Sequence, residues 1–304
     1  MKLSEEVFNR DHALFGVLPT GEKGVRFDAS ILEGVVKSLV KDKLSDENAG
    51  MSEMPTPDYK PCPIFVVTTS AAVAQGPPIL FRSYNSEEND ADNCPIWKAA
   101  RATSAAPSFF DPMFIDVPAP GAWHVDGGLR YNNPSQLALE EARHIWPRVK
   151  RFTLVSVGSG RQSNVEFVKI KDVQPPKETS KSLMGRIMSK VPGSGVVAKI
   201  KNVPGGMKVK ELANVWKACV EMSTSSEPTH QAMLKFAYST DPQSRFPYYR
   251  FNVESGMDSI GLEEWKAIVR IGEVTRQYMR EGVPKMERAK CVEGLTSPAP
   301  LECT

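Results

Sequence analysis

The chain has 304 residues, of which 41% are hydrophobic and 24% charged, and its formal net charge at pH 7 is +2. This is the composition of a soluble globular protein with a substantial core, and it excludes a globally basic nucleic-acid binder. No apolar run reaches the roughly 18 residues of a membrane span, and Glu5 and Glu6 stand where a signal peptide would need an apolar core. We therefore expect a cytoplasmic protein, with peripheral contact to membranes left open.

Cysteine and histidine spacing predicts no metal site and no disulfide framework. The five cysteines are odd in number and widely spaced, without a Cys-x-x-Cys pair, and the four histidines lack metal-ligand spacing. No cofactor is indicated either. His124 points to the opposite strand face from its immediate neighbours, and we expect it to be structural.

The first third of the chain predicts one helix and two strands. Apolar residues recur at helical spacing between Ile31 and Leu39, and Asp28 or Ser30 can cap that helix. Residues 46–63 are polar and form a loop. The unbroken run 64–69 suits a strand covered on both faces, the usual situation in a parallel sheet, and a second strand follows at 79–84.

The middle of the chain is organised around a tight turn at Asp126. A helix at 96–104 is rich in alanine and can pack closely on a sheet. A short strand then leads into Asp126, where two glycines permit positive φ and close backbone approach. The next helix, at 134–145, begins after an Asn133 cap, with Gln136 completing a capping box and an inward face expected at Ala138, Ala142 and Ile145.

A further strand at 152–157 ends in Gly158-Ser159-Gly160, so strand, helix and strand in this order predict a right-handed crossover in an α/β sheet. Lys169 to Lys210 then carries ten basic against two acidic residues, a net of +8. A solvated surface loop and an interfacial membrane helix around 183–191 both fit this segment. Beyond it we expect helices at 210–222, 227–239, 262–279 and 283–291, and a strand at 248–253.

One set of motifs closely resembles the second half of the patatin-like phospholipase domain. The resemblance rests on Trp97 to Pro107, Phe109-Phe110, Asp126-Gly127-Gly128 and Asn132-Asn133-Pro134. The flanking strands resemble those of the same domain, and the region from 248 to 278 resembles the C-terminal extension of fungal-type members.

The resemblance implies an incomplete three-layer α/β/α domain with a mostly parallel sheet and a helical C-terminal extension. Residues 1–165 would be the C-terminal portion of the patatin-like domain and 166–210 a basic linker or surface insertion. Residues 211–291 would be a mainly helical extension of the same domain, and 292–304 a tail.

The resemblance also implies a serine lipid acyl hydrolase with a Ser/Asp dyad, acting on phospholipid or another acyl lipid. Asp126 would be the general base, with Gly127, Gly128, Asn132, Asn133 and Arg101 as supporting motif residues. A carboxylate can serve without histidine, because it needs only to accept the serine proton within hydrogen-bond reach.

This chain departs from the family because it contains no Gly-x-Ser-x-Gly and no glycine-rich oxyanion loop. Ser70 follows a strand but lacks flanking glycines, and Ser159 has glycines at the wrong spacing. We therefore expect a domain that lacks its N-terminal part. An enzyme that carries only the aspartate half of its dyad, a non-catalytic lipid-binding or interaction module that uses Lys169 to Lys210 at an anionic membrane, and an inactive fragment remain as alternatives.

Overall fold

The structure is a computed structural model of the whole chain, and it falls into two compact units. The first contains residues 1–132 and 165–224, and the second residues 133–164 and 225–304. The structure describes residues 2–8, 13–17, 23–52, 62–73, 76–85, 94–106, 109–117, 120–149, 151–160, 225–239, 246–257, 260–261 and 263–296. The predictions for Lys169 to Lys210 and for a helix at 210–222 lie outside the described residues.

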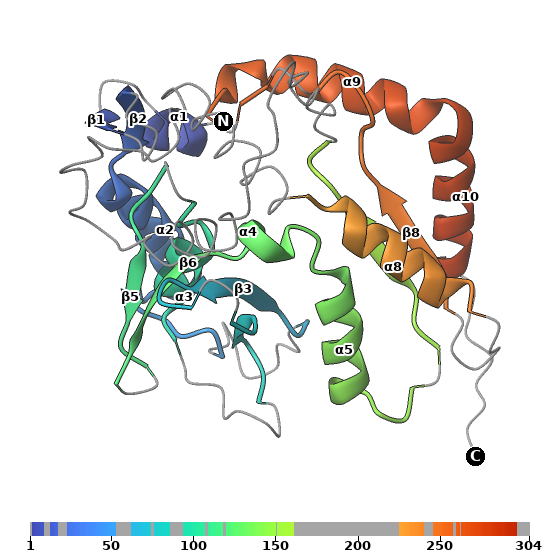
Figure 1. Cartoon of the computed structure of the whole chain (residues 1–304), viewed down its shortest axis with the longest axis horizontal. Coiled ribbons are helices and arrows are strands. Elements are labelled where there is room, and N and C mark those ends of the chain that lie inside the picture. Colours follow the sequence, from blue (N-terminus) through green and yellow to red (C-terminus); the bar gives the residue numbers. More distant parts are fainter. Residues whose placement is uncertain are drawn as a thin grey trace, which may run out of the picture. The chain divides into compact units, whose positions relative to one another are not determined.

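The elements of the two units are shown in Figure 1. The first unit contains α1 (Lys2–Val7), β1 (Ala13–Val17), β2 (Lys23–Phe27), α2 (Ala29–Leu44), β3 (Phe65–Ser70), β4 (Ile79–Arg82), α3 (Ile96–Thr103), β5 (Met113–Ile115), β6 (Ala122–Asp126) and α4 (Gly128–Tyr131). The second contains α5 (Ser135–Ile145), β7 (Leu154–Val157), α8 (Glu227–Ala237), β8 (Tyr248–Phe251), η2 (Trp265–Ala267), α9 (Ile268–Arg280) and α10 (Gly282–Thr296).

Helix α2 forms where the apolar spacing predicted it. The Asp28 carboxylate accepts a hydrogen bond from the Ser30 N–H at 2.8 Å, which satisfies one of the free donors at the helix start. The helix ends at Ser45, whose left-handed backbone (φ 63°) lets its N–H donate to the Lys41 carbonyl. Both ends are thus set by local sequence.

The main sheet of the first unit is antiparallel throughout, in the order β4-β3-β6-β5, and β1 and β2 form a separate antiparallel pair. The expectation of a mostly parallel sheet is therefore wrong for the described residues. The connections of β3 to β4 and of β5 to β6 are short, and such links can join antiparallel strands, whereas a parallel pair needs a longer crossover. The inference of two-sided cover holds at the centre of β3, where Val67, Thr68 and Thr69 are all buried.

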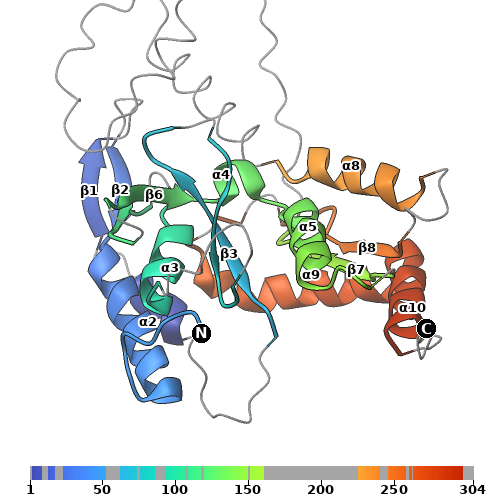
Figure 2. The same ribbon diagram turned by 90° about the horizontal axis from the view of Figure 1, so that it is seen from below.

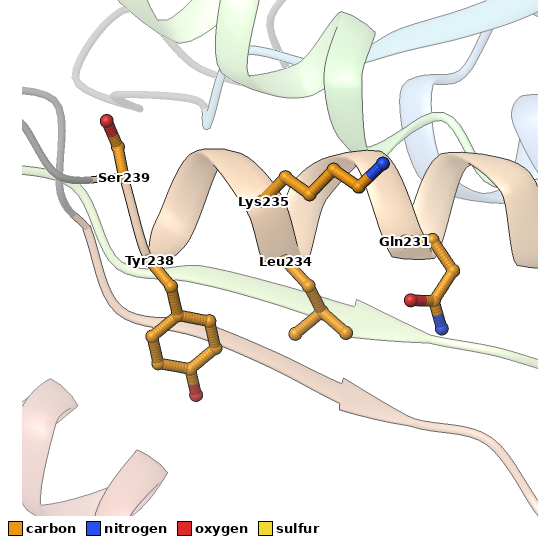
Figure 3. A pocket seen from close by; sticks show the side chains of 5 residues that line it. All are labelled: Gln231, Leu234, Lys235, Tyr238 and Ser239. Atoms are coloured by element: carbon orange, nitrogen blue, oxygen red, sulfur yellow. The ribbon is translucent and has the colours of Figure 1, made fainter.

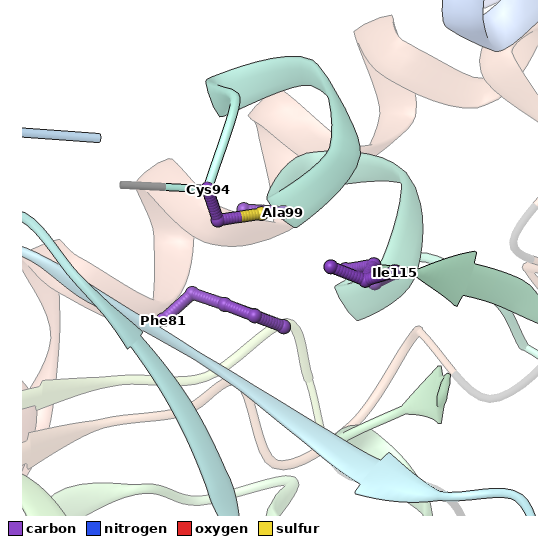
Figure 4. Packing of buried hydrophobic residues seen from close by; sticks show 5 residues of the cluster. Phe81, Cys94, Ala99 and Ile115 are labelled. Atoms are coloured by element: carbon purple, nitrogen blue, oxygen red, sulfur yellow. The ribbon is translucent and has the colours of Figure 1, made fainter. Parts of the chain in front are cut away.

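The alanines of α3 bring this helix close to the sheet, as their small size predicted. Ala99 and Ala102 are fully buried and pack with Phe81, Cys94 and Ile115 in one hydrophobic core (Figure 4). The helix contacts β3, β5, β6 and α2. The first unit has a second core, centred on Val7, Phe27 and Phe110.

The second unit is built around a two-stranded parallel sheet of β7 and β8 (Figure 2). In this pair Leu154 lies opposite Tyr248. Helix α8 contacts β8, and α5 contacts both α8 and β7. Because β7 pairs with β8 and β6 pairs with β3 and β5, the predicted crossover from β6 to β7 within one sheet is wrong. The parallel pair instead joins strands that are far apart in the sequence.

The buried face of α5 also differs from the prediction. Leu139 lies in the core with Met233, Ala237, Phe246 and Tyr248, whereas Ala138, Ala142 and Ile145 stay partly exposed. Gln136 donates to Glu140 at 2.9 Å, one turn along the helix, and therefore does not complete a capping box. Within the described ranges, no helix combines the length and apolar character needed to cross a bilayer.

Arg101 is a buried cation that connects α3 to the residues around it. This residue of the sequence motif is thus part of the first unit's core. Its side chain is 2% exposed. Its Nη2 donates to the Asp111 carbonyl at 2.6 Å, and its Nε lies 3.6 Å from the Glu33 carboxylate on α2. The guanidinium also lies over the Phe110 ring, 5.5 Å from its centroid.

We expect Arg101→Lys to lower the free energy of unfolding of the first unit by about 2 kcal/mol, because one ammonium cannot hold both the carbonyl and the carboxylate. Urea denaturation would measure this loss. Arg143→Lys, on the exposed surface of α5, is the control and should change stability by less than about 0.5 kcal/mol. Equal values for the two variants would contradict the role given to Arg101.

Candidate active site

Asp126 is the last residue of β6, and its position is fixed from three directions. Its N–H donates to the Ala105 carbonyl at 3.1 Å. In the sheet it lies opposite Thr68 of β3. Its Oδ1 accepts the N–H of Gly128 at 2.6 Å, so the carboxylate turns back over the start of α4. The acid therefore lies at the strand-to-helix turn that the sequence predicted.

Gly127 is required by close approach and not by unusual backbone angles. Its φ is −63° and its ψ −25°, which any residue can adopt. A Cβ at this position would collide with the backbone carbonyl of Val67 on β3. That carbonyl also accepts the Thr103 hydroxyl at 2.7 Å. Of the two properties that glycine permits at such a turn, Gly127 uses the close backbone approach and not a positive φ.

Gly128 keeps the space around the carboxylate open. A Cβ there would lie 3.0 Å from Asp126 Oδ1, closer than ordinary van der Waals contact. A side chain here would have to push the Asp126 carboxylate aside by a few tenths of an ångström, whereas glycine leaves the hydrogen bond uncrowded. Both glycines thus serve the placement of Asp126.

The environment of Asp126 makes its carboxylate a stronger base than that of an ordinary aspartate. Burial raises its pKa, because removal from water disfavours the charged form, and the Gly128 hydrogen bond only partly opposes this. Within the described residues, this N–H is the one hydrogen-bond donor to the carboxylate. The other oxygen is therefore available to accept a proton.

His124 lies on the same face of β6 as Asp126 but is buried in the core. It is 3% exposed, its Nδ1 lies 3.0 Å from the Thr68 hydroxyl, and its ring packs against Phe81 at 5.2 Å. Burial lowers its pKa, since the protonated form would lose its hydration. These contacts give His124 a structural role, as the sequence indicated.

The asparagine pair of the motif falls on the boundary between the units. Asn132 is exposed and belongs to the first unit, whereas Asn133 is buried in the second. Asn133 Oδ1 accepts from the Ser135 N–H at 3.3 Å, from the Ser135 hydroxyl at 2.5 Å and from the Ser156 hydroxyl at 3.3 Å. Its amide donates to the Ser226 carbonyl at 3.3 Å, so Asn133 joins the start of α5 to β7 and to the segment before α8.

Arg250 completes this network. It donates to the Ser156 hydroxyl at 2.6 Å and to the Ser226 hydroxyl at 2.9 Å. Sequence reasoning did not find this group, because its members lie up to 117 positions apart and only the fold brings them together. The structure thus groups Asp126, Gly127 and Gly128 at one turn, and places Asn133 and Arg101 in structural networks.

Neither substitute serine is built as a nucleophile. The Ser70 hydroxyl accepts the N–H groups of Ala72 and Val73, at 3.2 and 3.3 Å, in a turn without flanking glycines. Ser159 belongs to the second unit, in a turn where the Gly160 N–H donates to Asn252 Oδ1 at 2.9 Å. Neither hydroxyl donates to Asp126 within the described part of the chain.

An open depression on the surface of α8 is unrelated to these residues (Figure 3). It is lined by Gln231, Leu234, Lys235, Tyr238 and Ser239. None of them is a predicted site residue. The described residues also contain no group of three or more His, Cys, Asp or Glu side chains that could hold a metal ion.

Comparison with known proteins shows which family these features are similar to. Residues 3–139 match the model of the patatin-like phospholipase family. Calcium-independent phospholipase A2-gamma of Homo sapiens is 31% identical over 169 residues, covering 53% of this chain and 20% of the relative. Phospholipase A I of Arabidopsis thaliana is 43% identical over 65 residues, covering 21% of this chain and 5% of the relative.

A third relative is the probable inactive patatin-like protein 9 of Arabidopsis thaliana, 29% identical over 143 residues, which cover 45% of this chain and 35% of the relative. The chain spans about a fifth of the length of the phospholipase A2-gamma relatives that it matches.

We expect Asp126→Asn to stabilise the fold at pH 7. The raised pKa means that folding opposes ionisation, so the folded state is destabilised above that pKa and relieved as pH falls below the ordinary value of 3.8. Asparagine keeps an oxygen for the Gly128 N–H and carries no charge. Urea denaturation should show a more stable variant at pH 7 and a difference that shrinks towards pH 3. A variant that is less stable at pH 7 would contradict this account of the carboxylate.

Proposed function

Because residues 3–139 match the model of the patatin-like phospholipase family, we propose that this chain carries the general base of a serine lipid acyl hydrolase with a Ser/Asp dyad. The observation that supports the proposal is the half-buried Asp126 in its Asp-Gly-Gly turn, within the matched residues and with a raised pKa. The substrate is the acyl ester of a phospholipid or a related lipid. Phospholipases among the relatives support this substrate class.

In each half-reaction Asp126 first accepts a proton and then donates it. As the serine Oγ attacks the ester carbonyl, the hydroxyl proton passes to the carboxylate oxygen that Gly128 leaves unbound. Collapse of the tetrahedral intermediate breaks the ester C–O bond, and the leaving alkoxide takes that proton to depart as an alcohol. Water then attacks the acyl-serine and gives a proton to Asp126, which returns it to the serine as the fatty acid leaves.

The dyad serine is not present in its family motif, since the sequence contains no Gly-x-Ser-x-Gly. Removing the nucleophile of a serine hydrolase costs on the order of a millionfold in turnover, and losing an oxyanion donor costs roughly a hundredfold or more. The proposal therefore requires a segment beyond these 304 residues to supply both groups. Asp126 alone does not hydrolyse an ester at a useful rate.

A second candidate function is a non-catalytic lipid-binding or interaction module of the same family. The missing serine motif favours it, and so does the relative described as a probable inactive patatin-like protein. Lys169 to Lys210, with its net charge of +8, would contact the anionic surface of a membrane from the cytoplasmic side. An inactive fragment is the outcome if neither activity is found.

Hydrolysis of a fluorogenic phospholipid should depend on Asp126 only in a protein that also contains the serine. In a chain extended upstream to include a Gly-x-Ser-x-Gly segment, we expect Asp126→Asn to lower kcat by at least about 10⁴-fold. Asp116→Asn is the matched control, because Asp116 is a 63% exposed acid of the same unit, and it should retain the rate. Absence of such a segment from the upstream reading frame, or full activity of Asp126→Asn, would refute the catalytic proposal.

The lipid-binding module predicts that more of the chain sediments with anionic vesicles than with zwitterionic vesicles at low salt, and that this excess is lost at roughly 0.5 M salt, because screening weakens the attraction of the basic segment. Replacing the lysines of 169–210 by glutamine should abolish the excess. Binding that changes neither with salt concentration nor with these substitutions would exclude electrostatic attraction as its cause.

A further inference from the structure

Two aromatic side chains stand exposed on the β5–β6 hairpin, at the edge of the first unit's sheet. Phe114 and Trp123 lie directly opposite each other in the strand register, with ring centroids 5.3 Å apart. They are 40% and 56% exposed. The alternation of side chains along β6 places Trp123 on the opposite face of the sheet from His124 and Asp126. The pair therefore belongs neither to the core nor to the turn at Asp126.

The backbone fixes the aromatic pair in place. Gly121 has a φ of +81°, and a Cβ there would lie 2.7 Å from the Phe114 ring and 2.8 Å from the Ile115 carbonyl. Only glycine adopts this conformation readily and lets the ring cover the turn. On the other side, the Trp123 carbonyl accepts the Ala71 N–H at 2.8 Å, just before the 56% exposed Val73. These contacts fix the backbone on both sides of the aromatic pair.

The size and polarity of this surface fit a lipid interface better than a protein partner. The two rings together expose about 200 Å², far below the roughly 800 Å² that each partner contributes to a stable protein interface. The described residues form no hydrogen bond to the Trp123 indole N–H, which leaves it for water or a lipid headgroup. A tryptophan with an apolar body and a free polar edge is the side chain typical of membrane–water interfaces.

The charged residues beside the aromatic pair indicate that its contact with a membrane would not be electrostatic. Asp116, which follows β5, is paired with Lys98 at 2.6 Å, so this part of the hairpin presents no net charge to a membrane. Attraction to lipid would therefore come from apolar burial, and salt would not weaken it. The hairpin and the basic segment at 169–210 would therefore bind lipid through different forces.

We propose that the β5–β6 hairpin inserts Phe114 and Trp123 into the interfacial layer of a phospholipid bilayer. The choice of lipid as the partner rests on the proposed function. Insertion would place the first unit, which carries Asp126, against the surface that contains its substrate. The segment at 169–210 would act separately, by long-range attraction to anionic lipid.

Partition of the chain onto zwitterionic phosphatidylcholine vesicles tests this proposal. We expect Phe114→Thr combined with Trp123→Thr to lower the partition coefficient at least about tenfold, because the lost apolar area is the main attraction. Threonine retains the preference for a strand. Wild-type partition should change less than about twofold between 0.1 and 0.5 M salt. Phospholipids with brominated acyl chains should quench wild-type tryptophan fluorescence more strongly than that of Trp123→Thr.

Trp146→Thr is the matched control, since Trp146 is 43% exposed but lies outside the hairpin, and it should leave partition unchanged. Thermal unfolding of Trp123→Thr, which keeps Phe114 over Gly121, separates lost binding from lost folding. Unchanged partition of the double variant would overturn the proposal. A wild-type chain that forms a dimer, together with a double variant that is monomeric, would also overturn it. The measurement needs no turnover, so absent hydrolysis bears only on the proposed function.

Discussion

The close approach of β6 to β3 is the constraint on which the rest of the candidate site depends. At Gly127 the backbone passes so near the Val67 carbonyl that no side chain fits between them. The same carbonyl is held by the Thr103 hydroxyl of α3, so strand, turn and helix meet at one atom. This contact ends β6 at Asp126 and starts α4 with the Gly128 N–H directed at the carboxylate. A side chain at Gly127 would therefore displace the acid, even though the residue's own backbone angles are ordinary.

The family motif consists of two groups of residues with different tasks. Asp126, Gly127 and Gly128 position a carboxylate, whereas Asn133, seven residues later, holds a buried network with Ser156 and Ser226. Arg250 closes that network from β8, which lies outside the matched residues 3–139. The second group thus needs the C-terminal part of the chain for its hydrogen bonds. Buried polar networks of this kind are costly when only partly satisfied, so these partners belong together.

Sequence patterns predicted the features that depend on local chemistry. The Asp28 cap, the tightly packed alanines of α3 and the turn at Asp126 follow from residues within a few positions of one another. Strand pairing did not follow, because a buried apolar run such as 65–70 is compatible with parallel and antiparallel neighbours alike. The Asn133 network was also missed, since it depends on contacts between distant segments. Strand β5 was missed for another reason, because its three residues are too few to show a pattern. Residue type left open whether Gly127 serves positive φ or close backbone approach, and the fold shows that the requirement is a carbonyl on another strand.

The energetics of Asp126 agree with the catalytic role that we propose for it, because its carboxylate costs stability. A structural carboxylate at a turn usually stays solvated, which leaves its pKa at the ordinary value, or accepts several hydrogen bonds, which lower its pKa. Here burial raises the pKa, and one N–H is the donor that the described residues provide. An asparagine would bind that N–H without the cost of a half-buried charge. A site that retains the less stable choice has the character of a functional one, because catalytic groups commonly hold strained or perturbed states. The same reasoning applies to Trp123, whose exposed ring adds little to the core but suits contact with a lipid surface.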